Sequence, residues 1–267
     1  MHAAVLGQPI AHSLSPALHN AGYKALGLEH DFTAIECSES SFKHVLESCD
    51  DSWMGLSLTM PLKEAAFTVA DTVTSVAVLA RSANTLLLTD KIHADNTDVY
   101  GIVQAIREHS LVKAHRAVII GSGATARSAV VACHELGITT IDLIARNKRA
   151  LNECGDIAQR LGIAATATDP REVVFTETTI TINATPAGVA DALIPVLHPP
   201  AGAILDVVYH PWPSAITHHW LTSGLVAIPG HEMLLHQAVK QFQLMTGFAA
   251  PVDIMRQALV DALHNSN

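Results

Sequence analysis

The feature that most constrains the fold is a glycine-rich segment between a short apolar run and a helical one. Residues 117–120 read AVII, which is typical of a buried strand, and residues 121–123 read GSG. Residues 125–136 then have the spacing of a helix, and residues 140–145 form the next apolar run. A strand, a glycine turn, a helix and a second strand in this order predict a βαβ unit with a parallel sheet.

Apolar runs alternate with helical segments along most of the remaining chain, so we expect an α/β protein with helices on both faces of a parallel sheet. We place two domain boundaries, near residues 98–101 and 228–230, and expect the last helices to return to the first domain. The expected strands are residues 3–6, 32–35, 53–58, 85–89, 92–94, 117–120, 140–145, 179–183 and 204–208. The expected helices lie near residues 16–27, 98–109, 125–136, 148–161, 233–246 and 252–264.

Composition indicates folded domains and restricts the partners. Of the 267 residues, 49% are hydrophobic and 15% are charged, which provides enough apolar side chains for a sizeable core. The formal net charge is -9, so the surface as a whole repels phosphate backbones. We therefore expect neither nucleic acid nor a membrane as the main partner, while a small anionic substrate remains compatible with a local basic pocket.

Cysteine and histidine spacing argues against a metal site. The four cysteines form no C-x-x-C pair, and they indicate reduced thiols in a cytoplasmic protein. Sixteen histidines are present, but His231 and His236 are five residues apart and therefore face different sides of a helix. We expect no bound metal. The first residues lack the pattern of a secretory signal, and no apolar run is long enough to span a membrane.

The glycine turn predicts a dinucleotide site. Gly121 permits the tight turn, and Gly123 lets the backbone approach a pyrophosphate at the helix N-terminus. NAD sites usually carry an acid at the end of the second strand, about 20 residues further on. Here residues 145–149 read ARNKR and contain no acid. Arg146 can stack on adenine or bind a 2′-phosphate, and a bound phosphate would offset cations at a helix N-terminus. We therefore expect NADP rather than NAD.

Four polar clusters in otherwise apolar surroundings predict a second site. Ser13 and Ser15 precede a helix and can bind a carboxylate, although Ser15 is also expected to cap that helix. Lys63 lies just inside an expected Pro-started helix that follows a strand. Residues 84–85 and 96–98 place further polar side chains before a strand and before a helix. Each cluster also has a plainer interpretation, as a helix cap or as a solvated side chain.

The clusters and the glycine turn together resemble the shikimate dehydrogenase family over nearly the whole chain. The order and the spacing of the similar stretches agree with the family. These stretches are GQPIAHSLSPALHN at 7–20, GLSLTMPLK at 55–63, SANTL at 82–86, DNTDVYG at 95–101, GSGATARSA at 121–129, NATPAGV at 183–189, DVVYHPWP at 206–213 and GHEMLLHQAVKQF at 230–242.

The resemblance implies an N-terminal α/β substrate domain, residues 1–100 completed by 231–267, and a Rossmann-type NADP-binding domain, residues 101–230, with a cleft between them. It implies NADPH-dependent reduction of 3-dehydroshikimate to shikimate, on the route to chorismate and the aromatic amino acids. The implied substrate contacts are Ser13, Ser15, Thr59, Lys63, Asn84, Asp98, Tyr209 and Gln237. The implied cofactor contacts are Gly121, Gly123, Ala124, Arg146, Asn183, Thr185, Val207 and Gly230, the last of which also lines the cleft.

Three positions depart from the family pattern. Ala124 stands where the family often has a second glycine, so the phosphate loop is expected to be slightly more open. Arg81 stands where glycine is usual before Asn84, which puts the local turn in question. Val189 replaces a common methionine near the nicotinamide, so the packing against that ring is open as well.

Reduction of a ketone requires a hydride at carbon and a proton at oxygen, and a nicotinamide supplies the hydride. Lys63 is charged at neutral pH and can donate to the developing oxyanion. Asp98 is then expected to hold the ammonium and to bind a substrate hydroxyl. The residues equally allow Lys63 and Asp98 to share the proton as a coupled pair.

Two other functions remain open on the sequence alone. One is a quinate/shikimate dehydrogenase that prefers NAD, against which Arg146 and the small Ser15 side chain both count. The other is a catalytically silent NADP-binding regulatory protein, against which the presence of both Lys63 and Asp98 counts. We expect a monomer or a homodimer, and the sequence does not choose between them.

Overall fold

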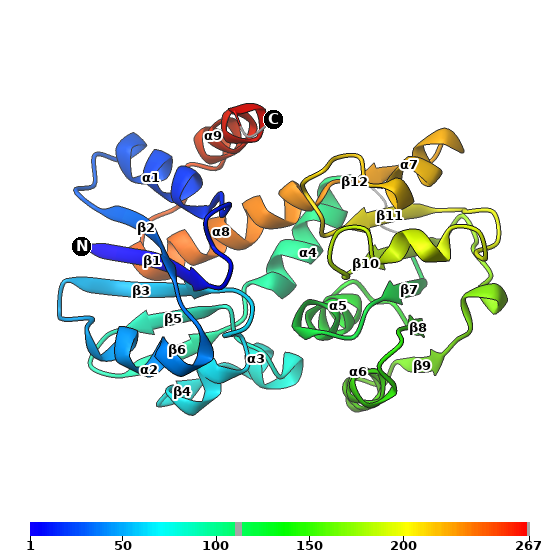
Figure 1. Cartoon of the computed structure of the whole chain (residues 1–267), viewed down its shortest axis with the longest axis horizontal. Helices are drawn as coiled ribbons and strands as arrows, with labels where there is room; N and C mark the ends of the chain where they lie inside the picture. The colour runs from blue at the N-terminus through cyan, green and yellow to red at the C-terminus, as the bar shows by residue number, and fades with distance from the viewer. Residues whose placement is uncertain (110–113, 266–267) are drawn as a thin grey trace. The chain divides into compact units, whose positions relative to one another are not determined.

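Two six-stranded sheets organise the chain, and each belongs to its own unit (Figure 1). The computed structural model describes residues 1–109 and 114–265. Unit 1 comprises Met1–Gly101 with Leu234–Asn267, and unit 2 comprises Ile102–Met233. One boundary falls within helix α4 (Asp98–Glu108) and the other within helix α8 (Gly230–Thr246). Among the described residues, no helix is both long enough and apolar enough to cross a membrane.

Unit 1 contains a mixed sheet in the strand order β2-β1-β3-β5-β6-β4. Its strands are β1 (His2–Gly7), β2 (Asp31–Glu36), β3 (Trp53–Leu58), β4 (Thr72–Val73), β5 (Thr85–Leu88) and β6 (Ile92–Asp95). Strand β1 pairs in parallel with β2 and β3, whereas β5 pairs antiparallel with β3 and β6. The antiparallel pairing of β5 with β6 confirms the expected hairpin.

The sheet of unit 1 separates two hydrophobic cores. The remaining helices of this unit are α1 (Ser15–Ala25), α2 (Glu39–Glu47), α3 (Ser75–Ala80) and α9 (Val252–Asn265), with a 3-10 helix η1 (Ala65–Thr68). Because successive side chains of a strand point to opposite faces, Ala3 and Val5 of β1 pack with α1, α8 and α9, while Ala4 and Leu6 pack with α2. Helices α1 and α9 lie side by side, so the end of the chain completes this unit (Figure 1).

Unit 2 contains an all-parallel sheet in the order β12-β11-β10-β7-β8-β9. Its strands are β7 (Arg116–Ile120), β8 (Thr140–Ile144), β9 (Ala164–Ala167), β10 (Thr179–Asn183), β11 (Ala203–Asp206) and β12 (Ala227–Ile228). Its helices are α5 (Ala124–Glu135), α6 (Lys148–Arg160) and α7 (Ala215–Thr222), with 3-10 helices η2 (Pro170–Glu172) and η3 (Ala190–Leu193). This is the strand order of a Rossmann fold, in which ligands bind at the carboxyl edge where the order reverses.

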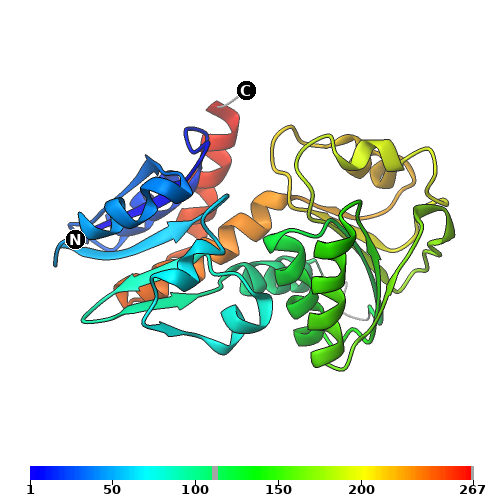
Figure 2. The same cartoon turned by 60° about the horizontal axis from the view of Figure 1, so that its bottom comes forward.

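Helices cover the sheet of unit 2 and fill its cores. Helices α5 and α6 lie side by side (Figure 2). Val118 and Ile120 of β7 pack in a separate core with Ile216 and Trp220 of α7. The reversal of strand order falls between β7 and β10, so the glycine turn after β7 lies where this fold places a ligand.

Two expectations about helix starts are wrong. The N-cap of α1 is Leu14, without a side-chain hydrogen bond, and the Ser15 N–H instead donates to Ser13 Oγ at 3.4 Å. Lys63 does not lie in a Pro-started helix but in a turn that precedes η1. Its carbonyl accepts a hydrogen bond from the Ala83 N–H at 2.8 Å, so that carbonyl is not free to continue a helix.

Candidate active site and cofactor pocket

Lys63 and Asp98 form an ion pair inside unit 1. Lys63 lies in the turn after β3, and Asp98 is the first residue of α4. Lys63 Nζ is 2.5 Å from Asp98 Oδ2, and the two side chains are 15% and 5% exposed. Withdrawal from water strengthens the attraction between these charges. The site therefore holds an ammonium donor at a fixed position with its charge balanced by a carboxylate.

Asn84 occupies the centre of the polar cluster. It precedes β5 and is 2% exposed. Its Nδ2 donates to Thr97 Oγ1 at 2.9 Å and to Asp98 Oδ1 at 3.0 Å, and it lies 3.3 Å from Gln237 Oε1. Its Oδ1 accepts from the Thr97 backbone N–H at 2.8 Å. Because a backbone N–H can only donate, this bond fixes which way the Asn84 carboxamide faces.

Gln237 brings α8 into the same cluster. It is 6% exposed, and its Nε2 donates to the Leu234 carbonyl at 2.9 Å, which leaves Oε1 directed to Asn84. The structure thus brings together Lys63, Asn84, Asp98 and Gln237, four of the predicted substrate contacts, from segments far apart in the sequence. Thr97, which belongs to the predicted polar cluster at residues 96–98, joins them.

The other predicted substrate contacts come from other segments of the chain. Ser13 and Ser15 stand at the start of α1, and Ser15 is 4% exposed. Thr59 follows β3, and a Cβ on Gly7 would come within 2.3 Å of its Cγ2, so glycine lets the loop that leads to α1 approach Thr59. Among the described residues, no hydrogen bond joins Ser13, Ser15 or Thr59 to the polar cluster around Asn84. Tyr209 belongs to unit 2, where burial raises the pKa of its phenol.

The turn before Asn84 forms although Arg81 replaces a glycine. Arg81 adopts the left-handed conformation with φ 48° as the C-cap of α3. The Ser82 N–H still donates to the Ala77 carbonyl at 3.3 Å, as expected for a helix that ends in this way. The departure at Arg81 therefore leaves the turn intact and introduces a conformation that glycine adopts more readily.

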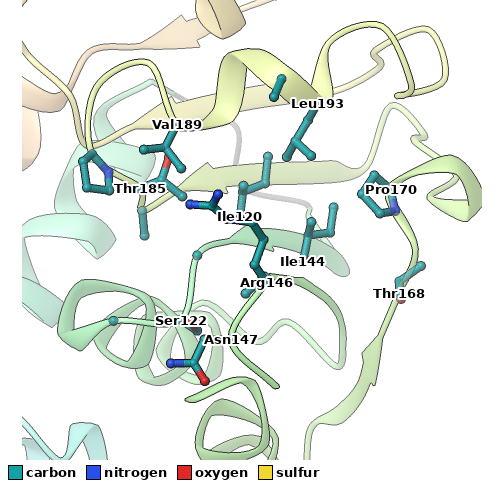
Figure 3. A pocket seen from close by; sticks show the side chains of 16 residues that line it. Ile120, Ser122, Ile144, Arg146, Asn147, Thr168, Pro170, Thr185, Val189 and Leu193 are labelled. Carbon is teal, nitrogen blue, oxygen red and sulfur yellow. The ribbon is translucent and has the colours of Figure 1, made fainter. Parts of the chain in front are cut away.

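A pocket of about 600 Å³ lies at the carboxyl edge of the unit 2 sheet (Figure 3). It gathers residues from the ends of β7, β8 and β10 and from η3. Four predicted cofactor contacts line it, namely Gly121, Gly123, Arg146 and Thr185. Val189, a departure from the family pattern, also lines it and is 39% exposed. The sequence did not single out Ser122, Asn147, Thr168, Pro170 or Leu193, which line it too.

The glycine turn has the geometry that a phosphate site needs. Gly121 has φ 118°, and a Cβ there would lie 2.9 Å from the Ala184 carbonyl oxygen, so glycine is required at this position. Gly123 is the N-cap of α5 and provides no side-chain cap, so no cap side chain competes for the first N–H groups of the helix. Nothing lies within 4 Å of a Cβ built on Gly123, which is space a ligand can approach.

Arg146 lines this pocket (Figure 3), and its side chain is exposed to solvent. In the described part of the chain it has no carboxylate partner. Its neighbour Asn147 caps α6, with Oδ1 accepting from the Ala150 N–H at 3.2 Å. A guanidinium without an internal partner beside a helix N-terminus fits the 2′-phosphate of NADP.

Asn183 supports the pocket wall from behind. It is 2% exposed; its Oδ1 accepts from Thr185 Oγ1 at 2.7 Å, and its Nδ2 donates to Asp206 Oδ1 at 2.9 Å. Asp206 also accepts from the Val208 N–H at 3.0 Å and from Ser214 Oγ at 2.5 Å, and burial raises the pKa of its carboxyl. These bonds hold the loop after β10 against the end of β11.

The remaining predicted cofactor contacts lie next to the pocket but not among the described residues that line it. Ala124 begins α5 directly after Gly123. Val207 and Gly230 touch each other, since a Cβ on Gly230 would lie 2.4 Å from the Val207 carbonyl oxygen. The Val207 N–H donates to the Asn183 carbonyl at 3.0 Å, so these residues form one supporting layer.

Known proteins resemble this chain in sequence and in structure. A family model described as "Shikimate dehydrogenase substrate binding domain" matches residues 5–86, and "Shikimate 5'-dehydrogenase C-terminal domain" matches residues 230–260. "Shikimate dehydrogenase (NADP(+))" of Prochlorococcus marinus (strain AS9601) is 31% identical to this chain in an alignment that covers 96% of each chain.

Two solved structures extend the similarity to the fold. Shikimate dehydrogenase of Mycobacterium tuberculosis superimposes with a TM-score of 0.89 at 37% identity, over 97% of this chain and 98% of that one. Shikimate 5-dehydrogenase of Thermus thermophilus, solved with NADP(H) and shikimate, gives a TM-score of 0.86 at 28% identity over 98% and 99% of the two chains. With sequence and structural similarity over almost its full length, this chain belongs to the shikimate dehydrogenase family.

Proposed function

We propose that this chain catalyses the NADPH-dependent reduction of 3-dehydroshikimate to shikimate, on the route to chorismate and the aromatic amino acids. The observation that carries the proposal is the partly buried Lys63–Asp98 ion pair, bonded through Asn84 to Gln237, in a chain of this family. Ammonium, carboxylate and two carboxamides together offer the donors and acceptors that a carbonyl and neighbouring ring hydroxyls require.

Lys63 is the proton donor in this proposal. An ammonium has three N–H bonds, and Asp98 Oδ2 accepts from one of them, so others remain for a substrate oxygen. As negative charge develops on the carbonyl oxygen, Lys63 Nζ stabilises it and transfers a proton to it. Asp98 holds Nζ in place and accepts from a substrate hydroxyl, while Asn84 Nδ2 holds the other carboxylate oxygen. If Lys63 and Asp98 share the proton as a coupled pair, the pair delivers the same proton to the substrate oxygen.

The remaining predicted residues bind and orient. Ser13 and Ser15 hydrogen-bond the substrate carboxylate, and Thr59 and Gln237 contact its hydroxyls. NADPH, when bound, supplies the hydride. The residues that hold it are Gly121, Gly123 and Ala124 at the pyrophosphate, Arg146 at the 2′-phosphate, and Asn183, Thr185, Val207 and Gly230 around the nicotinamide half. We further propose a cytoplasmic location, since the four cysteines are thiols and not disulfides, and a monomer or homodimer.

The test is a set of oxidation assays on the purified chain, followed by absorbance of the reduced nicotinamide. Shikimate and quinate are each combined with NADP and NAD, and we expect the largest kcat/KM for shikimate with NADP. Higher kcat/KM for quinate with NAD would identify the NAD-preferring alternative. Binding of NADP by fluorescence titration without turnover of either acid would identify a silent binder and reject the proposal.

A further inference from the structure

A second buried carboxamide lies beneath Asn84. Gln241 is one helical turn after Gln237 on α8 and is fully buried. Its Nε2 lies 2.9 Å from Thr85 Oγ1, 3.0 Å from the Asn84 carbonyl oxygen and 2.9 Å from Ser57 Oγ. Its Oε1 accepts from Ser57 Oγ at 3.1 Å. Gln241 therefore bonds to β3 and to the beginning of β5 at once.

The direction of these hydrogen bonds is fixed by chemistry. The Asn84 carbonyl oxygen can only accept, so the Gln241 atom next to it must be the amide nitrogen. The same nitrogen donates to Thr85 Oγ1, which leaves the Thr85 hydroxyl proton for Asn84 Oδ1 at 3.0 Å. A directed chain therefore runs from Gln241 Nε2 through Thr85 Oγ1 to the side chain of Asn84.

This chain ends on the group that contacts Asp98. Thr85 Oγ1 and the Thr97 N–H both donate to Asn84 Oδ1, so Asn84 Nδ2 must face Asp98 and Gln237. We propose that Gln241 is a positioning residue for the reduction: through Thr85 it orients the Asn84 carboxamide, and through Asn84 it holds Asp98 beside Lys63. The kinetic part of this inference rests on the proposed function, whereas the orientation of Asn84 does not.

Four substitutions probe the chain of hydrogen bonds. Gln241→Met keeps the side-chain volume and removes every hydrogen bond. Gln241→Glu places an acceptor where Nε2 donates, which draws the Thr85 hydroxyl proton away from Asn84. Thr85→Val removes the hydroxyl that donates to Asn84 Oδ1. Thr85→Ser retains this hydroxyl and should restore the hydrogen bond. The half-buried Gln243, two residues further on α8, provides the matched control Gln243→Met.

The first measurement does not depend on turnover. In ¹⁵N-labelled protein the Asn84 carboxamide resonances are assigned by their loss in Asn84→Ala. We expect Gln241→Met, Gln241→Glu and Thr85→Val to shift these resonances and to speed their exchange with solvent at least tenfold. Thr85→Ser and Gln243→Met should leave both unchanged. Unchanged Asn84 resonances in the Thr85→Val variant would overturn the proposal, even if both Gln241 variants fail to fold.

The second measurement is kinetic. We expect Gln241→Met to lower kcat/KM for shikimate at least tenfold and to change the Kd for NADP less than twofold. In an Asn84→Ala background the same substitution should cost less than a further twofold, because its effect passes through Asn84. A lower Tm with unchanged kcat/KM in the Asn84-containing protein would show a purely structural role and overturn the proposal. If the unsubstituted protein does not turn over shikimate, the proposed function fails, and the Asn84 resonances still decide the role of Gln241.

Discussion

Replacement of Lys63 by Met should lower both stability and activity, by different mechanisms. The substitution removes the ammonium and keeps most of the volume. It leaves the Asp98 carboxylate, which is 5% exposed, with the Asn84 amide as its side-chain donor. Removal of one partner of a buried ion pair costs roughly 3–5 kcal/mol, because the other charge stays buried without compensation. Since Asn84 remains and Lys63 is itself 15% exposed, we expect about 3 kcal/mol.

A second substitution separates the two effects. In the double variant Lys63→Met with Asp98→Asn, no uncompensated charge is buried, so at least half of the lost stability should return. The proton donor is still missing, so kcat should stay at least about 100-fold below that of the unsubstituted protein, with KM little changed in the single variant.

Urea unfolding at pH 7 gives the free energy of unfolding of each variant, and initial rates at saturating cofactor give kcat and KM. Lys43→Met is the control, because the Lys43 side chain on α2 is 81% exposed and should cost about 0.5 kcal/mol or less. The reasoning is refuted if Lys63→Met costs less than about 1 kcal/mol, which would mean that the pair contributes little in solution. Recovery of kcat in the double variant would refute the role of Lys63 as proton donor.

Three further predictions concern other parts of the molecule. Ser13→Ala and Ser15→Ala should each raise KM for shikimate about tenfold, since a hydrogen bond to a charged group contributes about 1.5–3 kcal/mol; unchanged KM in both would move the carboxylate site elsewhere. Arg146→Ala should raise KM for NADP about tenfold or more and leave KM for NAD within about twofold, and an equal loss for both cofactors would remove the support for a 2′-phosphate contact. Burial lowers the pKa of His19 from 6.5 to about 3, so below pH 6.5 the unfolded chain takes up a proton that the folded chain does not, and stability is lost as pH falls toward 3. Between pH 7 and pH 5, His19 should therefore lower the free energy of unfolding by about 2 kcal/mol. In urea unfolding at these two pH values, His19→Phe should remove this loss. An equal pH dependence of stability in both proteins would show that His19 does not cause it.

The aromatic surroundings of His19 explain why phenylalanine is the suitable replacement. The imidazole stacks on Phe32 with ring centroids 4.1 Å apart and lies near Phe242 and Tyr23. Among the described residues neither ring nitrogen has a hydrogen bond of good geometry, although Gln241 lies close enough to favour the charged ring. The phenyl ring therefore preserves the stacking and removes the titrating group.

The sequence predicted those elements whose signals are local. The run from β7 through the GSG turn to α5 and β8 carries strand, turn and helix signals within one continuous segment, and all four appear where expected. Helix α2 was missed although Phe42, Val45 and Leu46 have helical spacing, and all three pack in one core of unit 1. The sequence does contain a signal for the start of α2, since Ser38 and Ser41 form a reciprocal capping box.

The two errors about helix starts occurred where a specific hydrogen bond competes with a residue's helix preference. Pro61 suggested a helix that contains Lys63, but the Ala83 N–H binds the Lys63 carbonyl and keeps the segment in a turn. Ser15 has the residue type and the position of an N-cap, yet the Ser13 hydroxyl accepts the Ser15 N–H and the helix begins at Ser15. In both places one hydrogen bond, tertiary at Lys63 and local at Ser15, outweighs a preference of about 1 kcal/mol or less.

Asn84 and Gln241 show why residues that contact a substrate are easier to predict from a sequence than the buried residues that hold them in place. A carboxamide that is 2% exposed must satisfy both its oxygen and its nitrogen. An aspartate at this position would bring two carboxylates within about 3 Å and lose the donor to Asp98, so the residue type itself identifies a polar site. The residue type of Gln241 does not indicate a buried polar position, because a glutamine on an amphipathic helix is typical of a solvated position. Its spacing of four residues from Gln237 was the available signal, since it places both amides on one face of α8. That face becomes a buried one only when β3 and β5 pack against it, which the helix sequence alone does not specify.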